Sequence, residues 1–252
     1  MKKFKIKSYC KINLSLRVIK KLNSGYHNIL SLITFGNVYD IITISKIKNT
    51  KDKIDFSGQF KTGINKKSNT VIKVLNLLRK KKLLNNQTFK INIKKNIPHG
   101  SGLGGGSSNA ADLLNFLNLK MRLRLNKEKL IQLGSHIGFD VPINLERKNT
   151  FLTGKSNEML RFNKKFKLNI LIVFPNFICS TKKIYEKNRK LSSRIPASSF
   201  CVGNKRKLIN FLKREGNDLE KTTIQIYPKI KKIIDEINSK KGCYFSRITG
   251  SG

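Results

Sequence analysis

Apolar and polar residues alternate along much of the first hundred positions, which is the pattern of half-buried strands. The alternation covers residues 3–19, as one bent strand or two, and it returns at 88–97. "ILSLITF" (29–35) and "DIITISKI" (40–47) predict two further strands, joined by a turn at "GNVYD" (36–40). The first part of the chain therefore predicts a sheet with one face buried.

Helical spacing takes over between and after these segments. Residues 68–84 place apolar side chains at i, i+3, i+4 and i+7, and Ser68 or Asn69 can cap the helix. The same spacing follows residue 106 and recurs within 126–138, and helix-like segments lie around 205–215 and 227–240. The apolar positions of the first three helices are Val71, Val74, Leu75 and Leu78; Ala110, Leu113, Leu114 and Leu117; and Leu130, Leu133 and Ile137.

Strands gathered early in the chain, with helices of modest length, favour an α+β fold over a regular βαβ array. A chain of 252 residues can form one large domain or two of ordinary size. The segment "KLNILIVFP" (167–175) predicts a strand that opens a second unit. We therefore expect two domains, 1–154 and 155–252.

Basic residues dominate the charge: 53 Lys and Arg against 14 Asp and Glu give a net charge of +39. Such a chain attracts polyanions at low salt, and a nucleic-acid binder is one reading of it. However, the positive residues are spread through every segment, and the richness in Lys, Asn, Ile and Phe is typical of AT-rich codons. Aromatic residues make up only 8% of the chain, with no Trp, and no RNA-recognition core is present. Specific nucleic-acid binding is therefore disfavoured as the main function.

The cysteines and the apolar runs indicate in which cellular compartment the protein works. Cys10, Cys179, Cys201 and Cys243 lie far apart without a CxxC pair, which argues against a zinc site and a disulfide framework and predicts buried, reduced thiols. The apolar runs are too short to span a bilayer, and the basic N-terminus lacks the unbroken apolar core of a signal peptide. We expect a cytoplasmic protein that does not bind membranes.

A glycine-rich stretch, "PHGSGLGGGSSNAADLL" (98–114), joins a predicted strand to a predicted helix. Free N–H groups and the helix dipole make such a junction an anion site, and glycines let the backbone approach phosphate oxygens. Gly100, Gly102 and Gly105 satisfy GxGxxG, but the strand before them is one-sided and the second strand of a dinucleotide fold is missing. Neither a Walker A lysine nor protein-kinase signatures follow. The stretch predicts a phosphate site of another kind.

The Pro, Gly-Leu-Gly, Ser-Ser and Ala-Ala frame of this stretch resembles the phosphate loop of the galactokinase, homoserine kinase, mevalonate kinase and phosphomevalonate kinase superfamily. Three further stretches resemble the branch of that superfamily that acts on a cytidine-diphosphate-linked methylerythritol. They are "CKINLSLRVIKKLNSGYHNILSLI" (10–33), "GFDVP" (138–142) and "RITGSG" (247–252). Four motifs in the correct order make the resemblance specific.

The resemblance implies a nucleotide-binding domain like ribosomal protein S5 domain 2, followed by a ferredoxin-like domain. It also implies ATP-dependent phosphorylation of the substrate's 2-hydroxyl, in the non-mevalonate route to isoprenoid precursors. ATP would bring Mg²⁺, held largely by its phosphates and by Ser107 or Ser108. We expect a monomer or weak homodimer whose partner is this small molecule.

Gly138 and the Val141-Pro142 pair place Asp140 on a short, stiff turn, where an aspartate can be a turn-forming or capping residue or a general base. The resemblance implies that Asp140 is the base. The resemblance implies that Lys11 lies beside it and orients the hydroxyl. It implies cytidine binding by Tyr26, His27 and Tyr185, and substrate contacts by Asn13. The implied ATP-binding residues are Asn69, Pro98, His99, Gly100, Ser101, Gly102, Leu103, Gly104, Gly105, Gly106, Ser107 and Ser108.

The sequence departs from that branch at the C-terminus, where the chain stops at Gly252 while family members continue with a further strand and helix. We therefore expect an incomplete second domain. Two alternatives stay open: another small-alcohol kinase of the superfamily, and a polyanion-binding protein on an S5-like scaffold. The "GYH" turn and the "CKINL" start favour the cytidine branch.

Overall fold

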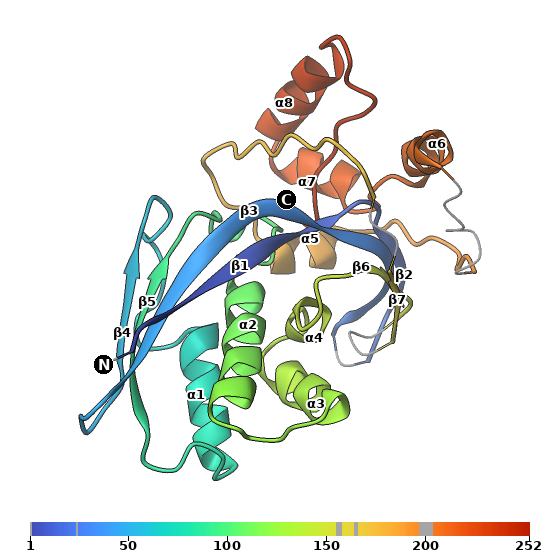
Figure 1. The fold of residues 1–252 in the computed structure, drawn as a ribbon. Coiled ribbons are helices and arrows are strands. Elements are labelled where there is room, and N and C mark those ends of the chain that lie inside the picture. The colour runs from blue at the N-terminus through green and yellow to red at the C-terminus, as the bar shows by residue number, and fades with distance from the viewer. Residues whose placement is uncertain (1, 24, 155–157, 164–165, 197–203) are drawn as a thin grey trace. The chain divides into compact units, whose positions relative to one another are not determined.

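The computed structural model describes residues 2–23, 25–154, 158–163, 166–196 and 204–252 (Figure 1). Within them it forms a mixed α and β fold. Its strands are β1 (Phe4–Asn13), β2 (Arg17–Lys21), β3 (His27–Ile47), β4 (Lys53–Ser57), β5 (Thr88–Lys94), β6 (Asn149–Leu152) and β7 (Met159–Phe162). Its helices are α1 (Thr70–Lys80), α2 (Gly105–Lys120), α3 (Lys127–Ile137), α4 (Val141–Asn144), α5 (Thr181–Lys187), α6 (Lys205–Glu215), α7 (Glu220–Ile226) and α8 (Lys229–Asn238).

The residues group into two compact units that are not contiguous in sequence. The first unit holds residues 1–11, 36–99 and 104–147, and the second holds 12–35, 100–103 and 148–252. The domain boundary expected at 154–155 remains a prediction, because residue 155 lies outside the described residues.

The first unit is a sheet covered by helices on one face. Strand β4 pairs parallel with β5, and β5 pairs antiparallel with the second half of β3. Helices α1 and α2 lie side by side across this sheet (Figure 1). Their apolar faces share one buried cluster with the inward side chains of β3 and β5, which include Ile42, Ile44, Ile91 and Ile93. This core fixes the end of α2 that the glycine-rich loop enters.

The second unit is built on the first half of β3. That half pairs antiparallel with β2 and with β6, and β6 pairs antiparallel with β7. A separate buried cluster joins the segment around Leu16 to helices α5, α7 and α8; its members are Leu16, Val18, Cys179, Ile184, Leu219, Ile230 and Ile248. The chain near the C-terminal motif is therefore part of a core.

The predicted helices are confirmed with small changes at their ends. α1 begins after Asn69, whose side-chain oxygen accepts hydrogen bonds from the backbone N–H groups of Val71 and Ile72, so Asn69 and not Ser68 is the cap. The apolar faces predicted for α1 and α2 are buried in full. The alternating residues at 3–19 form two strands, β1 and β2.

Two predictions were wrong. The turn expected at 36–40 is absent, because β3 runs without a break from His27 to Ile47 and Gly36 keeps a negative or extended φ. The strand expected at 167–175 is irregular, since no strand in the described part of the chain pairs with it and Leu171 is 79% exposed. An extended segment without a ladder partner leaves its backbone to water and gains no sheet hydrogen bonds.

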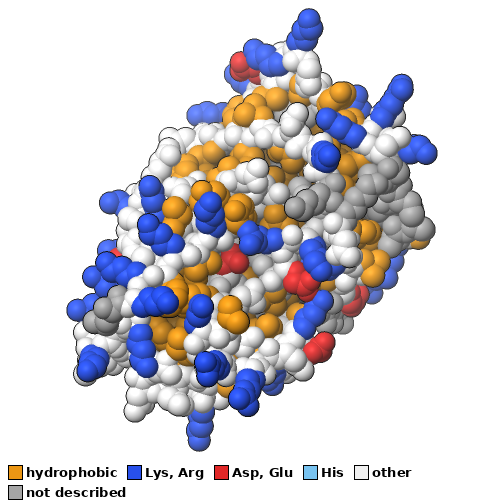
Figure 2. Space-filling view, in the orientation of Figure 1, with side chains coloured by type: hydrophobic (Ala, Val, Ile, Leu, Met, Phe, Trp, Pro, Cys, Tyr) orange, Lys and Arg blue, Asp and Glu red, His pale blue; other side chains and the backbone are white. Residues whose placement is uncertain are grey.

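Of the four cysteines, Cys10 and Cys179 are buried free thiols, as predicted, and burial raises the pKa of both. Cys243 is only half-buried, and Cys201 lies outside the described residues. Across the described residues, no helix is long and apolar enough to cross a membrane. Lys and Arg side chains are spread over the face shown in Figure 2 and do not gather in one patch there.

Candidate active site

Lys11 and Asp140 form an ion pair in the first unit. The Lys11 ammonium nitrogen lies 3.1 Å from Oδ2 of Asp140. The Lys11 side chain is 5% exposed, whereas that of Asp140 is 40% exposed. The carboxylate can therefore meet a ligand while its cation is held in the fold. The two residues are neighbours, as the family resemblance implied.

The turn that presents Asp140 is fixed from both sides. α3 ends at Ile137, and Asp140 caps the four-residue helix α4, with Pro142 in its first turn. The side-chain amide of Asn144 donates to the backbone carbonyl of Asp140 at 2.6 Å. Ser108 donates its hydroxyl to Asn144 at 2.7 Å, which ties this turn to α2. Ser108 is thus buried and bonded to protein, while Ser107 is half-buried.

The start of α2 lies against Lys11. Gly104 caps the helix with φ +67°, and a methyl group there would lie 3.2 Å from Cε of Lys11. Gly104 has no side chain to cap the helix, so the first N–H groups of α2 lack the partners that a cap supplies. Thr70 donates its hydroxyl to the carbonyl of Gly106 at 2.7 Å and links α1 to this turn. The arrangement is a glycine-walled helix N-terminus suited to an anion.

Asn69 lies beside this turn but already serves α1. Its oxygen caps the helix, and its amide nitrogen donates to the carbonyl of Asn65 at 3.0 Å. Asn69 therefore stabilises the start of α1, and its expected contact with adenine remains a prediction.

Residues 100–103 of the loop belong to the second unit and pack on the "RITGSG" segment. Gly102 has φ +68°, and a methyl group there would lie 2.1 Å from the carbonyl oxygen of Thr249. Leu103 is buried, Ser101 is half-buried, and Gly100 packs against Ile178. At the loop's start, Pro98 is buried and His99 is exposed.

The "RITGSG" segment is itself held by α7 and the residues before it. The amide of Asn217 donates to the carbonyls of Ile248 at 3.1 Å and Gly250 at 2.8 Å. The carboxylate of Glu220 accepts from the backbone N–H of Ile248 at 2.9 Å, and burial raises the pKa of Glu220. Asn217 and Glu220 could not be predicted from the sequence, since neither lies in a recognisable motif.

The three aromatic residues expected to bind cytidine lie in the second unit. The rings of His27 and Tyr185 are 4.8 Å apart, although 158 positions separate the two residues in the chain. Burial and the nearby Lys21 ammonium lower the pKa of His27, which keeps the ring neutral at pH 7. Tyr26, next to His27, is 53% exposed. The structure thus brings two of the three expected aromatic residues together.

Asn13 is 5% exposed and is oriented by the second unit around it. Its side-chain amide donates to the hydroxyl of Ser31 at 2.7 Å, and its backbone N–H donates to Oγ1 of Thr249 at 2.9 Å. Ser31 in turn donates to the carbonyl of Ser15 at 2.6 Å. Ser31 is a second residue that sequence reasoning missed.

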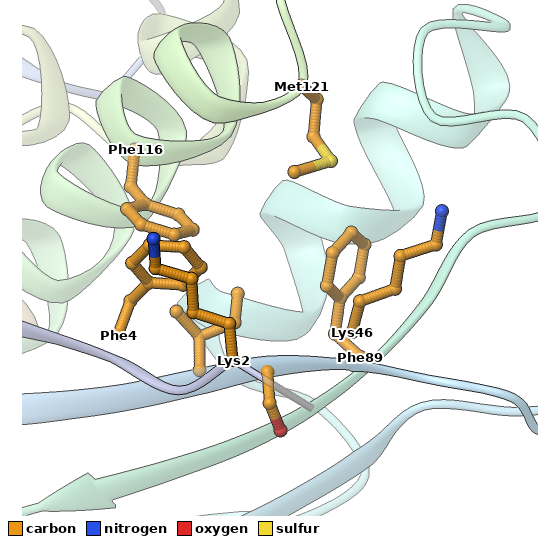
Figure 3. Close-up of a pocket in the computed structure, with 8 residues that line it drawn as sticks. Lys2, Phe4, Lys46, Phe89, Phe116 and Met121 are labelled. Atoms are coloured by element: carbon orange, nitrogen blue, oxygen red, sulfur yellow. The ribbon is translucent and has the colours of Figure 1, made fainter.

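A small cavity of about 160 Å³ lies elsewhere in the first unit (Figure 3). Phe4, Phe89, Phe116 and Met121 point into it, and lysines lie at its rim. None of the expected site residues lines it, and it is smaller than the several hundred Å³ typical of small-molecule sites. Among the described residues, no group of three or more His, Cys, Asp or Glu side chains could hold a metal ion.

Comparisons with known proteins agree with the motifs. Residues 69–145 match the model of the GHMP kinases N terminal domain, and residues 198–252 match that of the GHMP kinases C terminal. A relative in Pelagibacter ubique, named 4-diphosphocytidyl-2-C-methyl-D-erythritol kinase, is 41% identical over all of this chain and 88% of its own length. A relative of the same name in Caldanaerobacter subterraneus is 32% identical over 99% of this chain and 86% of its own.

Solved structures show the same fold. A crystal structure of 4-(cytidine 5'-diphospho)-2C-methyl-D-erythritol kinase superposes with a TM-score of 0.70 at 21% identity, covering 94% of this chain and 83% of the other. Homoserine kinase from Cytophaga hutchinsonii gives 0.61 at 13% identity, covering 100% and 83%. The α+β fold expected from the sequence is thereby confirmed. The chain belongs to the GHMP kinase family and, within it, groups with the 4-diphosphocytidyl-2-C-methyl-D-erythritol kinases.

Proposed function

We propose that the chain transfers the γ-phosphoryl group of ATP to the 2-hydroxyl of 4-diphosphocytidyl-2-C-methyl-D-erythritol. The observation that carries the proposal is the Lys11–Asp140 ion pair, placed against the glycine that caps α2. A phosphoryl transfer to an alcohol needs a proton acceptor, a cation and a cradle for phosphates, and this corner of the first unit supplies all three.

In the proposed reaction, Asp140 accepts the proton of the substrate hydroxyl. The hydroxyl oxygen forms a bond to the γ-phosphorus as the bond from that phosphorus to the β,γ-bridging oxygen breaks, and ADP leaves. Lys11 orients the Asp140 carboxylate and stabilises negative charge that develops on the reacting oxygens. Its burial holds it in one place, so little reorganisation is needed during the reaction.

The phosphates would bind at the loop of residues 98–108, on N–H groups that precede and begin α2. A Mg²⁺ ion that arrives with ATP would neutralise phosphate charge. Of the two serines expected near it, Ser107 is the better placed, because the Ser108 hydroxyl already donates to Asn144.

The cytidine end of the substrate would bind in the second unit. Tyr185 and His27 offer aromatic surface and a neutral ring nitrogen, and Tyr26 offers a further exposed ring. The Asn13 side chain, oriented by Ser31, would contact polar groups of the substrate. We propose that the protein works in the cytoplasm as a monomer or weak homodimer.

A coupled assay of ADP release tests the proposal. The purified chain is given ATP and Mg²⁺ with the cytidine-diphosphate methylerythritol, homoserine or mevalonate. Turnover that requires the first substrate is expected. Turnover with homoserine or mevalonate alone would assign another kinase of the superfamily. No turnover, together with nucleic-acid binding that survives ~200 mM salt, would identify a polyanion-binding protein instead.

A further inference from the structure

A buried ion pair lies beneath the glycine-rich loop, and the reaction above does not use it. Asp40 of β3 and Lys95, just after β5, are 0% and 4% exposed. The Lys95 ammonium contacts Oδ2 of Asp40 and lies 3.0 Å from Oδ1 of Asn109, which is on α2. The Asn109 amide donates to Oδ2 of Asp40 at 3.0 Å. The three side chains form a closed triangle.

The second carboxylate oxygen of Asp40 holds the backbone that leads into the loop. It accepts hydrogen bonds from the N–H groups of Asn96 at 2.7 Å and Ile97 at 2.9 Å. The Asn96 side chain adds a bond to the carbonyl of Tyr39 at 2.9 Å. The two residues that precede Pro98 are therefore fixed by one buried carboxylate.

The same triangle reaches the other end of the loop. Asn109 lies one turn into α2, and a methyl group on Gly105 would lie 3.4 Å from the Lys95 nitrogen. The triangle thus joins β3, the entry to the loop and the first turns of α2. In the described part of α2, the first turn holds no acidic residue and no side chain caps the helix, so neither feature fixes its start.

Burying a carboxylate and an ammonium costs several kcal/mol for each ion unless both are paired and hydrogen-bonded. Here the two opposite charges face each other and both contact Asn109, although burial still lowers the pKa of Lys95, and together they add no net charge at the entry to the loop. What the pair adds is a fixed spacing between the loop's entry and α2. A phosphate loop gains affinity when its donors are held in place before the ligand arrives.

We propose that Asp40, Lys95 and Asn109 are positioning residues that hold the glycine-rich loop at the spacing required for nucleotide phosphates. This inference rests on the proposed function, since it takes the loop to bind ATP and ADP. It goes beyond that function because the three side chains fix the backbone next to the loop and do not contact the phosphates themselves.

A second ion pair in the same unit provides a matched control. Arg79 binds both carboxylate oxygens of Asp52, at 2.7 and 2.9 Å, and Asp52 also accepts the backbone N–H of Phe89 at 2.8 Å. Like Asp40, Asp52 pairs with a cation and accepts a backbone N–H. However, it holds the start of β5, whereas Asp40 holds the residues between β5 and the loop. Removing it should lower stability without touching the loop.

The test measures ADP affinity by titration calorimetry, and thermal stability, on the full chain. The variants are Lys95→Met, Asp40→Asn, the double Asp40→Asn/Lys95→Met, and the milder Asn109→Ala. We expect Lys95→Met and Asn109→Ala to weaken ADP binding at least ~5-fold at a temperature where both are folded, the size typical of coupled neighbours. We expect Asp52→Asn to lower the melting temperature with ADP affinity within about twofold of wild type, as for an independent site.

The double variant should be more stable than either single one, because each single variant leaves an unpaired buried charge. If Lys95→Met or Asp40→Asn fails to fold, Asn109→Ala decides, since it keeps the ion pair. Wild-type ADP affinity in folded network variants would overturn the inference and reduce the triangle to a stabilising feature. Failure of the wild-type chain itself to bind ADP would instead contradict the proposed function.

Discussion

Gly102 and Thr249, 147 positions apart in the chain, pack so closely that a single added methyl group would overlap. That methyl would lie 2.1 Å from the Thr249 carbonyl oxygen, and the Gly102 backbone has φ +68°, where side chains are strained. Residues 100–103 of the glycine-rich loop and the C-terminal glycine motif are therefore complementary surfaces within the second unit.

Gly102→Ala should consequently lose both stability and ADP affinity. The backbone conformation alone costs about 1 kcal/mol with a Cβ, and the overlap with a carbonyl adds to it. Gly242→Ala is the control, because Gly242 has φ +86° in the same unit but open space around it. Calorimetric titration with ADP is the measurement, and equal losses in the two variants would show that close packing on Thr249 does not matter.

Asp140→Asn and Lys11→Ala should each lower kcat at least ~100-fold, as is typical when a positioned acid–base or charge-stabilising group is lost. ADP affinity of Asp140→Asn should change little, because the carboxylate is proposed to meet the hydroxyl and not the phosphates. Lys127 is exposed and lies 2.7 Å from the half-buried Glu146 in the same unit, so Lys127→Ala is a control with normal kcat. Near-normal turnover of Asp140→Asn would show that Asp140 is not the base.

Tyr185→Ala should raise KM for the cytidine substrate ~5- to 100-fold and leave KM for ATP unchanged. The reason is the loss of a stacking surface, worth roughly 1–3 kcal/mol per base. Tyr185→Phe keeps the ring and should retain most of the affinity. Tyr244→Ala, which removes another ring from the second unit, should alter neither constant, because Tyr244 is 62% exposed and lies outside the proposed site. A parallel rise in both KM values would argue against a cytidine contact.

Asp112, on α2, should make stability depend on pH. Burial raises its pKa to about 6, although the Arg147 guanidinium opposes the shift. Between pH ~4, where the unfolded carboxyl titrates, and pH 6, the folded state holds the proton more tightly. The stability that Asp112 contributes is therefore full below pH ~4 and is lost as the pH rises through 6.

Asp112→Asn removes this titration. Its melting temperature relative to wild type should rise by several degrees between pH 4 and pH 7, because the difference between a folded pKa of about 6 and the unfolded value near 4 corresponds to roughly 2–3 kcal/mol. A flat difference for Asp112→Asn across that pH range would rule out a buried, protonated carboxyl.

The helices could be read from the sequence, while parts of the sheet could not. The apolar residues of α2, among them Leu113, Leu114 and Leu117, recur at helical spacing, which predicts a helix and not a strand. The Gly36-Asn37 pair has the composition of a turn, but β3 continues through it without a break. The short strands β4, β6 and β7 were missed because four or five residues give too little alternation to distinguish them from loops.

The candidate site shows the same division. The Lys11–Asp140 pair followed from a motif resemblance, and the geometry brings the two side chains together. The Asp40–Lys95 pair had no local signal, because Lys95 is one of 53 basic residues and its partner is 55 positions away. Only the folded chain distinguishes a buried lysine from its many solvated neighbours.

The uncapped start of α2 has a consequence for hydrogen exchange. Gly105, Gly106 and Ser107 begin a helix whose cap residue, Gly104, has no side chain to accept their amide hydrogens. Their amides should exchange rapidly with deuterated solvent in the free protein and slow when ADP phosphates accept them. Three consecutive amides would thereby act as a built-in reporter of nucleotide occupancy, readable without any catalytic turnover.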